Sequence, residues 1–223
     1  MTGFVVVMLP LVLALGVWQL QRAAEMRGYQ ERYFDRLGML PQAPPRTLSD
    51  VDFLRLRLTG EYLPGEHYLV DNKLRNGEPG YWVVSRFRCA GGRVYLLNRG
   101  WLAAPASRGE LPAVPTPEGP VTVVGVVWPD TGMTLLLAAD PWPERWPKRV
   151  QRLNVSRMAQ DAGAQPAEIR LESGQPGVLA AAPVDAAFRP ERHQGYAVQW
   201  FGLAVVLLAG FVLFGFYRHG PRS

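Results

Sequence analysis

Charged residues are missing from both ends of this 223-residue chain. No charged side chain lies between Met1 and Leu20, and after Gly195 only Arg218 and Arg222 are charged. A protein exposed to water along its whole length is therefore excluded. The charged middle of about 175 residues is long enough for one domain with its own core.

Cysteine and histidine are also scarce. The single cysteine, Cys89, excludes an internal disulfide, a CxxCH heme attachment and a CxxC metal or redox site. The three histidines are too far apart to form a local metal motif, and GxSxG, HExxH, Walker and GxGxxG motifs are absent. We expect His67 at the surface beside a turn and no specific role for His219. Basic and acidic residues are scattered through the middle, which predicts a solvated surface and no nucleic-acid site.

Two apolar runs predict two membrane-spanning helices. Residues 3–20 would span about 27 Å as a helix, and residues 196–217 are longer and carry aromatic residues near both ends. The first helix is expected to continue through helix-forming residues to about residue 37. Two spans put both termini on one side of the membrane. Arg218 and Arg222 favour a cytoplasmic tail at residues 218–223, whereas the four arginines that follow the first span favour the opposite orientation, so charge leaves the side open.

The middle, residues 45–190, has the pattern of a mainly β domain. The pair Gly91-Gly92 predicts a hairpin, and residues 154–162 predict a short helix that ends at Gly163. The expected fold class is a membrane protein with two transmembrane helices flanking a mainly β (α+β) domain of sandwich or partial-barrel type. The expected strands are residues 53–59, 67–72, 81–89, 93–101, 121–128 and 169–172.

The two-span topology brings the exit of the first helix and the entry of the second to the same leaflet. Trp18 and Arg22 lie at the exit. If the second helix begins a turn early, His193, Tyr196 and Trp200 follow at i, i+3 and i+7 on one stripe. These five residues form the candidate site.

Two interpretations of this region stay open. The aromatic residues fit an ordinary interfacial belt with His193 among the headgroups. They also fit a noncovalent porphyrin site, in which the imidazole binds iron axially and Arg22 or Arg192 meets the propionates. Gln19 and Gln199, polar residues in membrane segments, need partners and could instead bridge the two helices.

At these residues the sequence resembles the Surfeit locus protein one family, the membrane assembly factors of cytochrome c oxidase. The resemblance covers nearly the whole chain and rests on four ordered segments in a two-span frame. They are GVWQLQR at 16–22, GY at 80–81, VYLLNRGW at 94–101 and RHQGYAVQWF at 192–201.

The resemblance implies a protein that binds heme a noncovalently and assists its insertion into cytochrome c oxidase subunit I. Heme a synthase is a further candidate partner. With no mitochondrial transit segment, the chain is expected in the lipid bilayer of a bacterial inner membrane, with its main domain facing the periplasm. His193 becomes the axial ligand of the heme iron, with Trp18, Arg22, Tyr196 and Trp200 as supporting residues.

No enzymatic activity is expected from this resemblance. One alternative is a chaperone that stabilises an oxidase assembly intermediate without holding heme. A second is a membrane-anchored enzyme of unknown substrate, which a convergent pair of His67 and a carboxylate would favour.

Overall fold

The computed structural model describes residues 2–48, 51–107, 109–129, 142–181 and 188–218. Most of the predicted cytoplasmic tail, residues 219–223, lies outside these ranges. In chain order the elements are α1 (Thr2–Leu37), β1 (Arg55–Arg75), β2 (Glu78–Cys89), β3 (Val94–Ala103), β4 (Val121–Trp128), β5 (Lys148–Val150), α2 (Val155–Ala162), β6 (Glu168–Leu171) and α3 (Pro190–Arg218).

The chain divides into a helix unit, residues 1–31 and 183–223, and a sheet unit, residues 32–182. Helices α1 and α3 are each long and apolar enough to cross a membrane, and only 22% and 11% of their most apolar stretches are buried. A core helix of a water-soluble domain would bury most of such a stretch, so these surfaces suit lipid. The predicted class, two such helices flanking a mainly β domain, is confirmed.

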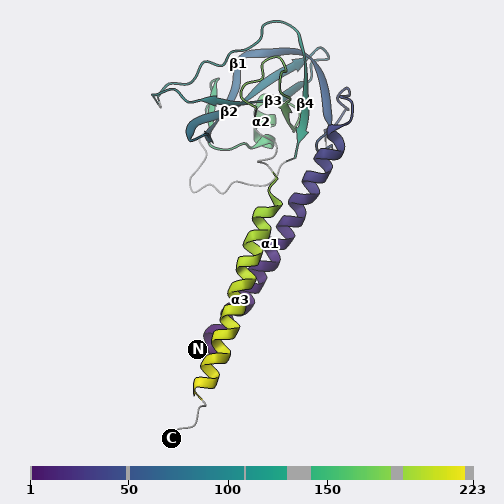
Figure 1. The fold of residues 1–223 in the computed structure, drawn as a ribbon. Helices are drawn as coiled ribbons and strands as arrows, with labels where there is room; N and C mark the ends of the chain where they lie inside the picture. The colour runs from purple at the N-terminus through teal and green to yellow at the C-terminus, as the bar shows by residue number, and fades with distance from the viewer. Residues whose placement is uncertain (1, 49–50, 108, 130–141, 182–187, 219–223) are drawn as a thin grey trace. The chain divides into compact units, whose positions relative to one another are not determined.

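The six strands of the described sheet unit belong to one sheet, in the order β2-β3-β6-β4-β1-β5, with a further pairing of β2 to β1 (Figure 1). The long strand β1 makes this possible because different parts of it serve different neighbours. Its residues 55–60 pair antiparallel with β4, and its residues 60–75 pair antiparallel with β2. Strand β5, which the sequence did not predict, adds in parallel to residues 68–70.

Two local predictions are confirmed. Strands β2 and β3 form an antiparallel hairpin across Gly91 and Gly92, and Gly92 has the positive φ of 78° that the turn requires. Helix α2 begins after Asn154, whose side-chain oxygen accepts the Arg157 N–H at 3.0 Å. It ends at Gly163, with φ of 59° in the left-handed region.

A buried arginine, Arg99 of β3, holds two chain segments, at residues 115–116 and at residue 177, against one face of the sheet. Its side chain is only 1% exposed, and its guanidinium lies 4.9 Å from the ring centre of Tyr62. A buried charge is tolerated only when hydrogen bonds satisfy it. The guanidinium donates to the carbonyl oxygens of Gly177 (2.6 Å) and Pro115 and to the hydroxyl oxygens of Ser85 (3.4 Å) and Thr116 (3.2 Å).

The next residue, Gly100, lets the chain after β6 approach this strand. Its φ is 100°, and an added Cβ would lie 2.5 Å from the carbonyl oxygen of Ala180. That same oxygen accepts the Trp101 N–H at 2.7 Å. Only glycine fits both the conformation and the space.

The expectation that His67 is a surface residue is wrong. His67 is 6% exposed, because segments 114–117 and 177–179 cover the sheet face on which it lies. Burial away from water, assisted by the charge of Arg99, lowers the pKa of His67 from its usual 6.5 to about 4. Among the described residues His67 has no carboxylate partner, so the pair that would favour an enzyme is not formed there.

The buried neutral His67 predicts a loss of stability in acid. The unfolded chain binds a proton near pH 6.5 and the folded chain only near pH 4, so this contribution is complete above pH 6.5 and is lost as pH falls through that window. Relative to His67→Gln, the wild-type protein should lose about 3 kcal/mol of unfolding free energy between pH 7 and pH 4. Chemical denaturation of both proteins in detergent measures this difference, and parallel pH curves would contradict it.

Candidate site in the helix pair

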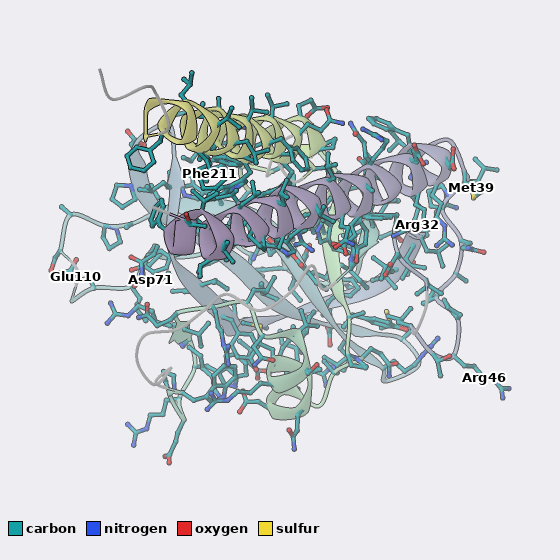
Figure 2. The ribbon with its side chains drawn as sticks, turned by 90° about the horizontal axis from the view of Figure 1, so that it is seen from below. Arg32, Met39, Arg46, Asp71, Glu110 and Phe211 are labelled. Carbon is teal, nitrogen blue, oxygen red and sulfur yellow. The ribbon has the colours of Figure 1, made fainter. Side chains whose placement is uncertain are left out.

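Helices α1 and α3 lie side by side and antiparallel within the helix unit (Figures 1 and 2). The contacts follow the antiparallel order: Gly16 of α1 lies against Phe201 of α3, and Tyr29, further along α1, stacks on Phe188, just before α3 begins. Along α1 the buried positions recur every seven residues, which is the pattern of a helix packed along a narrow seam. They are Val5, Val12, Gln19 and Met26, with Gly16 and Ala23 between them.

Small residues allow the two helices to approach closely along this seam. On α3 the buried positions Pro190, Ala197 and Ala204 again recur every seven residues. On α1, a Cβ added at Gly16 would lie 2.8 Å from the ring of Phe201. Close packing of small residues is a main source of helix association in lipid, where no hydrophobic force drives it.

A side-chain hydrogen bond joins the two helices across the seam. The Nδ1–H of His193 donates to the Oε1 atom of Gln19 at 2.8 Å. Gln19 is 9% exposed and His193 is partly buried. Because Nδ1 carries the proton in this arrangement, Nε2 of the neutral imidazole carries a lone pair. Nε2 has no hydrogen-bond partner in the part of the chain that the structure describes.

The three predicted aromatic residues lie on the same stretches of α1 and α3 but differ in exposure. Trp18 is 54% exposed and lies outside the buried stripe of α1. Tyr196, one turn from His193, is 40% exposed, and Trp200, a further turn away, is partly buried. The structure therefore brings Gln19 and His193 into contact and leaves the rings of Trp18 and Tyr196 open to a ligand or to lipid.

The candidate cations also lie near this level of the helix pair. The guanidinium of Arg22, one turn beyond Gln19, pairs with the Glu25 carboxylate at 2.8 Å. The guanidinium of Arg192 lies 6.0 Å from the ring centre of Tyr196. Either cation could meet a ligand carboxylate, but Arg22 would first have to exchange Glu25 for it.

The chemistry of these residues fits an iron porphyrin better than a bare metal ion. In the described parts of the chain, no three His, Cys, Asp or Glu side chains come together as metal ligands do. A porphyrin brings its own four nitrogen ligands, so the protein needs to supply only an axial donor and an apolar setting. His193 offers that donor at Nε2, and the exposed aromatic and aliphatic surfaces of α1 and α3 offer the setting.

Gln19 was not among the predicted site residues, although the expectation that it needs a partner is correct. The signal that could have identified it is its phase, since Gln19 occupies the seven-residue repeat of Val12 and Met26. Gln199 lacks this phase and is exposed on α3, with no side-chain partner among the described residues. The two glutamines, alike in sequence context, therefore differ in role.

Comparison with known proteins gives a consistent result over most of the chain. The SURF1 family profile matches residues 6–205. A SURF1-like protein of Rickettsia prowazekii is 25% identical, covering 94% of this chain and 86% of its own length. An uncharacterized SURF1-like protein of Mycobacterium bovis is 25% identical (91% and 77%), and the Surfeit locus protein 1 of Takifugu rubripes is 27% identical (85% and 86%).

The contact at Gly16 predicts that a larger residue there separates the helices. Gly16→Val should lower the stability of the helix pair by about 1–3 kcal/mol, because the new side chain meets the Phe201 ring. The loss should shrink in a Phe201→Ala background, as a double-mutant cycle measured by SDS titration of the detergent-solubilised protein would show. Gly202→Val is the matched control, since its Cβ meets nothing within 4 Å. Equal losses in both backgrounds would contradict the contact.

Proposed function

The chain belongs to the SURF1 family, and on that premise we propose that it is a membrane-anchored assembly factor for heme a-containing cytochrome c oxidase. The family is generally linked to assembly of this oxidase. We propose further that the chain binds heme a noncovalently and assists its insertion into oxidase subunit I. Heme a synthase is the partner proposed to supply the heme.

The observation that carries the heme proposal is the hydrogen bond between Gln19 and His193. It leaves Nε2 of His193 as a lone-pair donor in an apolar helix pair, which is what an axial heme ligand requires. An ordinary interfacial histidine would turn toward water and headgroups. Here the imidazole instead turns to a partner in the seam between two apolar helices.

Noncovalent binding is favoured because the sequence has a single cysteine and no CxxCH heme-attachment motif. Cys89 ends β2 in the sheet unit, and burial raises the pKa of its thiol. A poorly ionised thiol is a weak nucleophile. The proposed complex therefore holds heme by coordination, apolar contact and charge, and a noncovalent complex of this kind can release its heme to a second protein.

The helix pair suits a cargo that moves between membrane proteins. Heme a is a largely apolar molecule with two carboxylates, so it can lie against exposed apolar residues while Arg22 or Arg192 meets the carboxylates. We propose that the site lies at the periplasmic side of a bacterial inner membrane. Holding and passing on a cofactor requires no turnover, so the proposed activity is not enzymatic.

The first test is the visible spectrum of protein purified in detergent from cells that make heme a. Wild-type protein should carry a heme a band, and His193→Ala should lose most of it because the axial nitrogen is gone. Added imidazole should restore the band to His193→Ala. His67→Gln, which removes a histidine from the sheet unit, should retain the wild-type band.

Two outcomes would count against this proposal. Wild-type protein without a heme band, despite confirmed heme a synthesis, would contradict heme binding. A His193→Ala protein that supports oxidase assembly normally would instead favour the chaperone that works without heme.

A further inference from the structure

We propose that Gln19 is the positioning residue of the site: it holds His193 in the tautomer and orientation that leave Nε2 free to bind a heme iron. This inference rests on the proposed function for its ligand. The part of it that concerns the structure, control of the His193 imidazole by Gln19, involves only residues of this chain.

The geometry at the imidazole supports this role. Nδ1 and Nε2 flank Cε1 of the ring and their outward directions diverge widely, so a bond from Nδ1 to Gln19 at 2.8 Å directs the Nε2 lone pair away from Gln19. An amide oxygen can accept a hydrogen bond but cannot donate one. Its contact with Nδ1 therefore selects the form of neutral histidine in which Nδ1 carries the hydrogen. The hydrogen bond at one ring nitrogen thereby sets which nitrogen is available to a metal.

The seam keeps Gln19 in this position. Gln19 is buried on the α1 stripe, and leaving its amide oxygen unpaired in apolar surroundings would be costly. Packing of Gly16 against Phe201, about one helical turn away on α1, fixes the register of the two helices. A buried polar residue in an otherwise apolar seam also favours one register over its alternatives.

The amide oxygen also sets the strength of the axial donor. A neutral acceptor at Nδ1 makes the imidazole a moderate donor, whereas a carboxylate there would increase its electron donation to iron. Increased donation stabilises ferric heme and lowers its reduction potential. The identity of residue 19 should therefore change the reduction potential of the heme, although residue 19 does not itself bind the iron.

The first experiment needs no heme. The chain has three histidines, so apo protein labelled with ¹⁵N-histidine gives few signals, and the His193 signals are those absent from His193→Ala. At a pH where the imidazole is neutral, the nitrogen shifts of wild type should report the Nδ1–H tautomer. Gln19→Leu, which keeps the seam apolar, should shift His193 to a mixture of both tautomers.

The matched control is Gln199→Leu, which removes an exposed glutamine from the other membrane helix. It should leave the His193 nitrogen shifts unchanged. If Gln19→Leu also leaves them unchanged, the positioning role of Gln19 is overturned.

The second experiment uses protein loaded with heme a. Gln19→Leu should weaken heme binding by about 10–100-fold, the range seen when an outer partner of a metal-bound histidine is lost. Gln19→Glu should bind heme and lower its midpoint potential relative to wild type, which a purely structural role would not do. A Gln19→Glu protein with an unchanged potential would overturn the tuning.

The two experiments separate this inference from the proposed function. A wild-type protein that shows the Nδ1–H tautomer but binds no heme would contradict heme binding while supporting the control of His193 by Gln19. A protein that binds heme through His193, but whose His193 tautomer does not change when residue 19 is replaced, would support heme binding and contradict the control of His193 by Gln19.

Discussion

The proposed site depends on one hydrogen bond between two apolar helices. Gln19 is buried in a seam of mainly apolar side chains, where its amide oxygen would be costly to leave unpaired, and the partly buried imidazole of His193 supplies its partner. The close approach at Gly16, where an added Cβ would lie 2.8 Å from the Phe201 ring, keeps the two helices near each other about one turn from this bond. Packing and polarity thus act together to present a single nitrogen.

Within the sheet unit, hydrogen bonds hold the two chain segments that lead to and from the helices. The last carbonyls of α1 and the turn after it accept hydrogen bonds from Arg55, through Leu37 and Met39. At the segment that leads toward α3, the Trp101 N–H donates to the Ala180 carbonyl oxygen, and the absence of a side chain at Gly100 allows this close approach. A guanidinium group thus supports each connection: the partly exposed group of Arg55 at the first, and the buried group of Arg99, which donates to the carbonyl oxygen of Gly177, at the second.

Elements defined by local patterns could be predicted from the sequence, and those defined by long-range contacts could not. The apolar runs, the Gly91-Gly92 hairpin and the capped helix at 155–162 each carry their signal within a few residues. Strand β5 is only three residues long and exists because β1 lies beside it. His67 was misplaced for the same reason, since nothing local shows that distant segments cover its face.

The candidate site, too, could be predicted from the sequence only in part. Topology alone predicted that His193 and the exit of α1 would share a level, because two spans leave no other arrangement. The seven-residue spacing of Gln19 from Val12 and Met26 is present in the sequence, but the packed helices were needed to show that this spacing marks the face of α1 that meets α3. The central claim, that this pair presents a histidine nitrogen to heme iron, is tested most directly by pulsed EPR of ferric heme a bound to ¹⁵N-histidine protein. The account predicts coupling of one histidine nitrogen to the iron that disappears in His193→Ala, and coupling that persists in that variant would contradict it.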